Sequence, residues 1–226
     1  MNYVYSLFCA LGLFLISGTP PEARDTTPRI LVMGDSLMAA HRISGRAISD
    51  SIAKSLGEPV ADRSVSGARL IYKLPLSGAL GMNIAKQFRP GKWDWIIVNG
   101  GGNDLWLGCG CNKCDAKMNK MISKDGRSGV LPGLLSRLRG TGAQVIYVGY
   151  LRSPGVGSPI EHCHDDGNEL EHRVSALSKI DKGLHFVSLA DLVPNGDRSF
   201  HAMDMIHPSL KASAMIGERL AKLMQK

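Results

Sequence analysis

RILVMGDSL, residues 29–37, runs from an apolar stretch through a turn into a helical pattern. The apolar residues 29–33 predict a buried strand that ends at Gly34. Apolar residues recur with helical spacing in the second half of residues 37–56, and Gly57 suits the end of that helix. This arrangement places Ser36 at a strand-to-helix turn.

The rest of the chain repeats the alternation of strand and helix. Four more strands are predicted at residues 59–65, 93–98, 144–148 and 184–189. Helices are predicted at residues 130–139, 168–180 and 208–224. Alternating elements of this kind favour a parallel sheet covered on both faces, and five strands suggest a flavodoxin-like, doubly wound α/β fold. Reactive groups in such folds gather at the carboxyl ends of the strands.

Residues that could take part in catalysis follow three of these strand ends. Ser36 could present its hydroxyl above the sheet, although a serine is a weak nucleophile without a neighbouring base. Gly67 lets the backbone approach a ligand and offer an N–H, and the Asn103 amide can donate to a developing oxyanion. The alternatives are structural: Asp35 or Ser36 could cap a helix, and the other two could belong to ordinary turns.

A possible base lies near the C-terminus. Asp204 precedes His207 by three residues, so its carboxylate can hold one ring nitrogen and fix the tautomer. The other nitrogen is then free to take a serine proton. The alternative is that both residues merely cap the last helix.

These four blocks, in this order, resemble the SGNH (GDSL-type) hydrolase family. The matching residues are 34–37 (GDSL), 66–67 (SG), 101–104 (GGND) and 204–207 (DMIH), and the resemblance extends from about residue 29 to the C-terminus. It implies a three-layer α/β/α sandwich that hydrolyses esters through an acyl-serine. No metal or other cofactor is implied.

The resemblance also implies roles for individual residues. Ser36 is expected to attack the ester carbonyl, with His207 as its base and Asp204 orienting His207. The N–H groups of Ser36 and Gly67 and the side chain of Asn103 are expected to form the oxyanion hole. The neighbouring Asp35 and Asp104 are expected to support the loops.

Four cysteines remain after Cys9, which lies in the apolar N-terminal run: Cys109, Cys111, Cys114 and Cys163. An even number in an exported domain favours disulfides, with three possible pairings. A bond to Cys163 would tie the loops after the third and fourth strands together. A zinc site that includes His162 or His164 is the alternative, and it would point to a reducing compartment.

The N-terminal apolar run predicts export. Residues 1–23 resemble a signal peptide, or alternatively a retained membrane anchor, and residues 24–226 form the predicted hydrolase domain. The expected location is therefore periplasmic or secreted. The net charge of +7 is compatible with contact with an anionic membrane surface. No basic and aromatic run supports nucleic-acid binding.

The leading prediction is a carboxylic-ester hydrolase that acts on acyl or acetyl esters of small molecules, glycans or lipids. An envelope acyl- or acetyltransferase shares the same acyl-serine step, and a non-catalytic envelope-binding protein is the alternative from another class. No feature of the sequence indicates the oligomeric state. Five residues beside the blocks are candidates for setting specificity: Arg69, Tyr72, Lys73, Leu105 and Trp106.

Overall fold

The computed structural model describes residues 27–226. The predicted signal peptide or anchor, residues 1–23, lies outside this range. Within the described range, no helix is long and apolar enough to cross a membrane.

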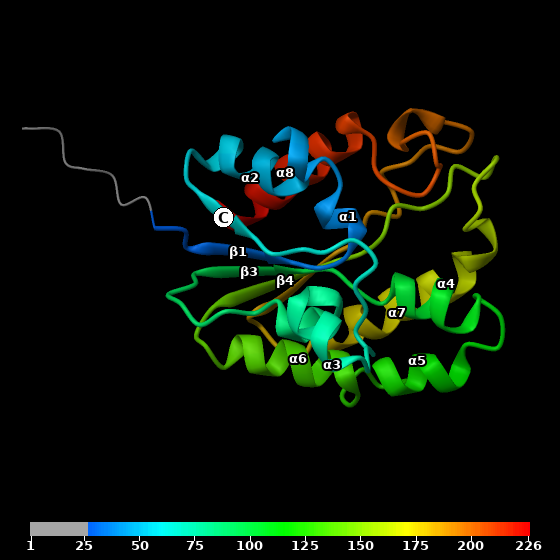
Figure 1. The fold of residues 1–226 in the computed structure, drawn as a ribbon, viewed down its shortest axis with the longest axis horizontal. Helices are drawn as coiled ribbons and strands as arrows, with labels where there is room; N and C mark the ends of the chain where they lie inside the picture. Colours follow the sequence, from blue (N-terminus) through cyan, green and yellow to red (C-terminus); the bar gives the residue numbers. More distant parts are fainter. Residues whose placement is uncertain (1–26) are drawn as a thin grey trace, which may run out of the picture.

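A parallel five-stranded sheet forms the centre of the molecule (Figure 1). Its strands are β1 (Ile30–Met33), β2 (Val60–Asp62), β3 (Trp95–Val98), β4 (Gln144–Val148) and β5 (Leu184–Val187). Their spatial order is β2-β1-β3-β4-β5, and all four pairings are parallel. This is the flavodoxin-like order, so the predicted fold class is confirmed.

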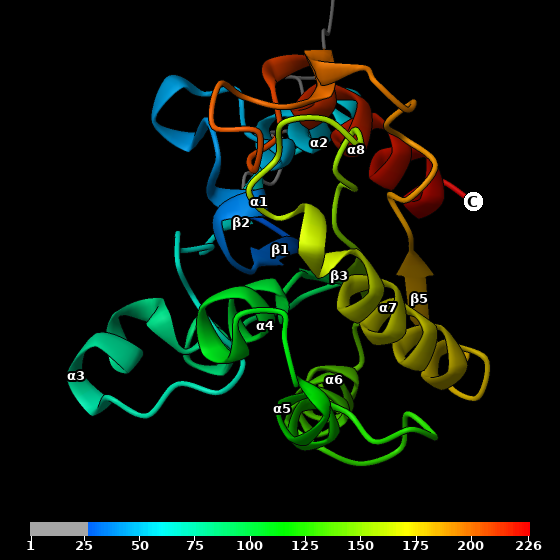
Figure 2. The same ribbon diagram turned by 90° about the vertical axis from the view of Figure 1, so that its right-hand side faces the viewer.

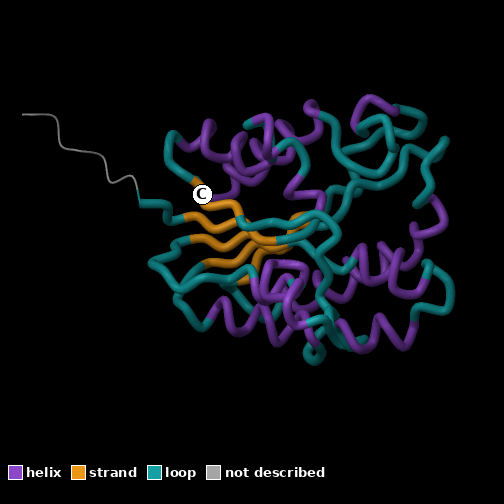
Figure 3. Tube along the Cα trace, in the orientation of Figure 1, coloured by secondary structure: helices purple, strands orange, loops and turns teal. Residues whose placement is uncertain are grey.

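Each face of the sheet supports its own hydrophobic core, as Figure 3 shows with the strands lying between two layers of helices. Successive side chains of a strand point to opposite faces. Thus Leu31 and Met33 belong to one core, while Ile30 and Val32 belong to the other. Because both faces are covered, the strands are almost continuously apolar rather than alternating.

One helical layer contains α1 (Ser36–Ala39), α2 (Ile48–Leu56) and α8 (Leu210–Met224). The other contains α4 (Gly102–Cys109), α5 (Asp115–Met121), α6 (Val130–Arg139) and α7 (His164–Ser178). Short helical segments complete the chain: η1 (Arg42–Ser44), α3 (Pro75–Ser77), η2 (Gly78–Met82), η3 (Ile84–Lys86), η4 (Glu161–Cys163) and η5 (Arg198–Phe200).

The helical pattern after the first strand is interrupted. His41 and Gly45 adopt left-handed backbone conformations, with φ of 65° and 64°, so the chain turns between α1 and α2. A left-handed residue cannot continue a right-handed helix. The second half, where the apolar spacing is helical, is the part that forms α2.

Candidate active site

The predicted site residues gather at the carboxyl edge of the sheet. In Figure 2, which faces this edge, α1, α4 and α7 surround the ends of the central strands. A cavity of about 110 Å³ opens among them, and Ser36, Asn103, His207 and Asp35 line it. Gly67 is not among the lining residues. The fold therefore brings Ser36 and His207, which are far apart in sequence, to one cavity.

Ser36 begins α1, two residues beyond the end of β1, and its position depends on Gly34. Gly34 has φ of 154°, and a Cβ added there would lie 3.0 Å from the Asn99 carbonyl oxygen. Gln87, the buried residue directly after η3, donates to the Gly34 carbonyl at 2.8 Å and accepts from the Gly34 N–H at 2.7 Å. This amide clamp fixes the turn that carries Ser36. Gln87 was not predicted as part of the site, because it stands 53 residues from Gly34 and outside every motif.

His207 and Asp204 form a direct contact. The Asp204 carboxylate lies 2.5 Å from His207 Nδ1 and accepts the backbone N–H groups of Ile206 and His207, both at 3.0 Å. Partial burial acts to raise the pKa of Asp204, but these hydrogen bonds outweigh it and lower the pKa to about 2. Asp204 is therefore ionised at neutral pH, and His207 Nε2 is left to face other partners.

The loop around His207 is constrained on both sides. Met205 has a left-handed φ of 57°, and its carbonyl accepts from the Ser158 hydroxyl at 2.8 Å. The His207 carbonyl accepts from the Ala202 N–H at 2.8 Å. Such conformations persist only where neighbouring groups hold them.

Within residues 27–226, no hydrogen bond joins Ser36 to the His207 ring, although both line the cavity.

Two backbone N–H groups of the predicted oxyanion hole have no hydrogen-bond partner among the described residues. Within the described part of the chain, the N–H groups of Ser36 and Gly67 make no hydrogen bond. Gly67 has a left-handed φ of 78°. Asn103 Nδ2 donates at 3.1 Å to the carbonyl of Ala68, the residue after Gly67. Because an amide nitrogen carries two hydrogens, this bond orients Asn103 and leaves one N–H available.

Asp104 supports the loop that follows Gly67, as the resemblance implied. Its buried carboxylate accepts the backbone N–H groups of Leu70 and Ile71, both at 2.8 Å. Burial raises the pKa of Asp104 to about 6, although these two hydrogen bonds act to lower it. The pair of bonds ties the segment after Gly67 to α4, which also carries Asn103.

Asp35 is the other supporting carboxylate, and its partner was not predicted. It accepts the Leu37 N–H at 3.0 Å and the Tyr150 hydroxyl at 2.6 Å. The Tyr150 oxygen in turn accepts the Gly102 N–H at 2.8 Å. Burial raises the pKa of Asp35 above its ordinary value, against the effect of the Tyr150 bond. Tyr150 therefore connects the ends of β1, β3 and β4.

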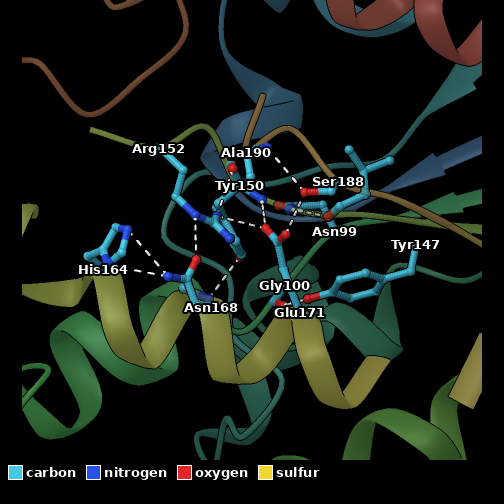
Figure 4. Close-up of polar contacts among 12 residues, drawn as sticks. Asn99, Gly100, Tyr147, Tyr150, Arg152, His164, Asn168, Glu171, Ser188 and Ala190 are labelled. Carbon is cyan, nitrogen blue, oxygen red and sulfur yellow. Dashed lines mark hydrogen bonds and ion pairs between the residues drawn. The ribbon is translucent and has the colours of Figure 1, made fainter. Parts of the chain in front are cut away.

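A buried ion pair holds the loop that carries Tyr150 (Figure 4). Glu171 of α7 accepts from the Tyr150 N–H at 3.0 Å, from Arg152 at 2.7 Å and from the Ser188 hydroxyl at 2.8 Å. Arg152 also donates to Asn168 at 3.0 Å. Because Glu171 and Arg152 are mostly buried and satisfy one another, they fix one wall of the cavity.

The four cysteines form two disulfides, Cys109–Cys114 and Cys111–Cys163. The second joins the loop after α4 to η4, so the predicted link through Cys163 is present. Both pairs occupy the sulfur atoms that a zinc site would need. The ligand atoms of Cys111, Cys163 and His162 nevertheless lie within 4.8 Å of one another.

The predicted specificity residues divide into two groups. Leu105 and Trp106 line the cavity from α4. Arg69, Tyr72 and Lys73 do not line it. Tyr72 instead shares a 2.9 Å hydrogen bond with Ser77, at the base of the α3 segment.

The chain belongs to the GDSL-like lipase/acylhydrolase family, whose sequence model matches residues 32–214. The chain is thus a member of a hydrolase family. A comparison with curated protein sequences found no match.

Solved structures show the same fold. A protein described as an SGNH hydrolase from Slackia heliotrinireducens superposes with a TM-score of 0.58 at 20% identity, covering 87% of this chain and 98% of that one. A family two carbohydrate esterase from Clostridium thermocellum, in complex with cellohexaose, superposes with a TM-score of 0.58 at 18% identity, covering 88% of this chain and 63% of that one. Est24, a carbohydrate acetylesterase from Sinorhizobium meliloti, superposes with a TM-score of 0.54 at 17% identity, covering 88% of this chain and 99% of that one.

Proposed function

We propose that this protein hydrolyses carboxylic esters through an acyl-serine intermediate, with Ser36 as nucleophile and His207 as general base. One observation carries the proposal. Ser36 and His207 line the same cavity, and Asp204 holds His207 Nδ1 at 2.5 Å, which leaves Nε2 for the serine proton. The missing direct contact fits a free enzyme, because catalytic hydrogen bonds often shorten only when substrate binds.

In the first half of the reaction, Ser36 Oγ attacks the ester carbonyl carbon while His207 Nε2 accepts the hydroxyl proton. The carbonyl oxygen becomes an oxyanion. The free N–H groups of Ser36 and Gly67 and the second N–H of Asn103 are the donors proposed to receive it. His207 then gives its proton to the leaving alcohol as the bond between carbonyl carbon and alcohol oxygen breaks.

In the second half, a water molecule attacks the acyl-serine carbonyl and gives a proton to His207. Collapse of this second intermediate releases the carboxylic acid and returns the proton to Ser36 Oγ. Asp204 acts throughout as a fixed anion beside the imidazole. Its low pKa keeps it charged, so it stabilises the imidazolium without taking the proton itself.

The expected substrates are acyl or acetyl esters outside the cytoplasm. Two features support this assignment. The two solved carbohydrate esterases share the fold, one of them described as an acetylesterase. The two disulfides are typical of proteins in an oxidising compartment, in keeping with a predicted export signal.

The direct test uses residues 24–226 with the cysteines oxidised. Hydrolysis of p-nitrophenyl esters of increasing acyl length is measured for wild type and for Ser36→Ala. Activity that disappears in Ser36→Ala supports the proposal. Equal rates for both proteins would show that hydrolysis does not depend on Ser36. No activity for either protein would favour a transferase with a strict acceptor or a binding protein.

A further inference from the structure

We infer that the Cys111–Cys163 disulfide is a wall of the acyl pocket and limits the length of the acyl chain. This inference rests on the proposed ester hydrolysis at Ser36. It adds a specificity determinant, namely a covalent bond between two loops that are 52 residues apart.

The position of the disulfide carries the first step. Cys111 and Cys163 both line the cavity that Ser36 and His207 line. Most of the remaining wall is apolar: Leu37, Leu105, Trp106, Leu151, Ile160, Leu170 and Ile206. A wall of this kind stabilises an aliphatic chain by removing it from water.

Arg152 is a cationic residue in this wall, but it does not favour an anionic acyl group. Arg152 lies 2.7 Å from Glu171, and both side chains are mostly buried. The charge of Arg152 is therefore already balanced inside the protein. A carboxylate brought next to it would also meet the negative charge of Glu171, so a neutral acyl chain suits this pocket better.

The size of the cavity favours a short chain. An enclosed apolar cavity of about 150 Å³ holds one benzene molecule. The cavity here measures about 110 Å³, and Ser36, Asn103 and His207 line it as well. The ester group therefore takes part of this space, and a long acyl chain would meet the wall formed by Cys111 and Cys163.

The loop carrying Cys111 adopts a conformation that needs support. Cys111 and Lys113 have left-handed backbone angles, with φ of 48° and 56°. The Cys111 N–H reaches back to the Leu105 carbonyl at 3.2 Å, which brings the loop against α4. Left-handed backbone is unfavourable for residues other than glycine. Without its bond to Cys163, this loop is expected to relax away from η4 and open the pocket.

The second disulfide provides a matched control. Cys109–Cys114 closes a separation of only five residues within the same region. Neither cysteine lines the cavity, and Cys114 is buried. Replacing either pair with serines removes one disulfide and two sulfur atoms, but only one replacement removes the proposed wall.

The experiment compares wild type, Cys111→Ser/Cys163→Ser and Cys109→Ser/Cys114→Ser. The value of kcat/KM is measured for p-nitrophenyl acetate, butanoate, hexanoate and octanoate. Wild type should prefer the short esters to octanoate. The Cys111→Ser/Cys163→Ser variant should lose about tenfold or more of the butanoate-to-octanoate preference, in line with what one methylene group is worth in an apolar pocket. The Cys109/Cys114 variant should keep the wild-type preference.

A wild-type measurement keeps the inference testable if the Cys111/Cys163 variant does not fold. The protein is first labelled at Ser36 with a methyl or a butyl p-nitrophenyl phosphonate, and then treated with a water-soluble phosphine. The butyl group should slow reduction of Cys111–Cys163 relative to the methyl group and leave Cys109–Cys114 unaffected. Equal reduction rates for the two labels would overturn the inference.

The outcomes separate the two proposals. A wild-type protein that hydrolyses no ester, and does not react with phosphonate, defeats the proposed function itself. An active wild type that hydrolyses octanoate as well as butanoate leaves the function standing and rejects the wall. Equal shifts in both cysteine variants also reject it, because they would show a general loosening of the loop.

Discussion

The Tyr150 hydroxyl donates a 2.6 Å hydrogen bond to Asp35, the residue directly before Ser36. The same oxygen accepts the N–H of Gly102, the residue directly before Asn103. One phenol thus joins the turn that carries the proposed nucleophile to the helix that carries a proposed oxyanion donor. The relative placement of these two groups depends on a residue outside the four sequence blocks.

Tyr150→Phe should therefore weaken both stability and activity. The substitution leaves a buried Asp35 oxygen and the Gly102 N–H without their partner, which costs about 1–3 kcal/mol for an unsatisfied buried group. Unfolding in urea should show this loss, and kcat should fall more than KM changes. Tyr72→Phe is the matched control, because it removes a tyrosine–serine bond away from the cavity.

The loss in Tyr150→Phe should also depend on pH. Burial already raises the pKa of Asp35, and losing the Tyr150 donor raises it further. A carboxyl with a raised pKa in the folded state binds its proton more tightly there, so stability falls as pH rises. The difference in unfolding free energy between wild type and variant should thus be larger at about pH 7 than at about pH 4. An equal difference at both pH values would contradict the coupling.

Asp104 gives a second pH effect. Its pKa is about 6 in the folded protein against an ordinary 3.8, so the folded state retains a proton over this interval. Wild-type stability should decline as pH rises through the interval, and Asp104→Asn should decline less. Urea unfolding across the interval measures both slopes. The exposed Asp94→Asn, which loses only its contact with Arg29, serves as control, and parallel slopes for wild type and Asp104→Asn would oppose the prediction.

Asp204→Asn tests the orientation of the base. The amide cannot hold His207 in the same tautomer, and this change reduces kcat by roughly 10,000-fold in a serine protease triad. Asp204 is 45% exposed, so water can replace part of its effect and a smaller loss, of roughly 100-fold or more, is expected. The loss should persist at every pH well above 2, because Asp204 stays ionised there.

The control for Asp204→Asn is Asp197→Asn, which removes a nearby carboxylate that contacts Ser199 and Lys211 instead. Its kcat should remain close to that of wild type. An Asp204→Asn variant with full activity would exclude Asp204 as the residue that orients His207.

Gln87→Leu tests the clamp on the nucleophile turn. The substitution removes the amide shared by the buried Gly34 N–H and the Gly34 and Gly81 carbonyls, and of these the Gly34 carbonyl keeps the Val65 N–H at 3.0 Å. The lost hydrogen bonds are expected to lower the free energy of unfolding by about 2 kcal/mol or more. If chemical denaturation gave no loss, the clamp would not be needed to hold the turn.

The centre of the sheet could be predicted because β1, β3 and β4 are short, mostly apolar runs that end at a turn. The ends of β4 and α6 match the prediction, since Gln144–Val148 and Val130–Arg139 carry clear local patterns. Helices α4 and α5 were not predicted. They lie in the cysteine-rich segment, where glycines and polar residues hide the periodicity and two disulfides hold the chain.

Much of the site could also be predicted, because three of its four blocks follow strand ends. Ser36 and Asn103 line one cavity, as expected from the ends of parallel strands meeting at one edge, and His207 joins them from the loop before α8. The supporting residues Tyr150, Gln87 and Glu171 could not be predicted. Each acts through contacts with residues distant in sequence, and no local pattern distinguishes a buried polar partner from an exposed one.

The most direct test of the account is labelling with a fluorophosphonate, followed by peptide mass spectrometry. Wild type should carry a single adduct on the peptide containing Ser36, Ser36→Ala should carry none, and His207→Ala should react far more slowly. Labelling of another residue, or no labelling of folded wild-type protein, would contradict the claim that Ser36 is the activated nucleophile.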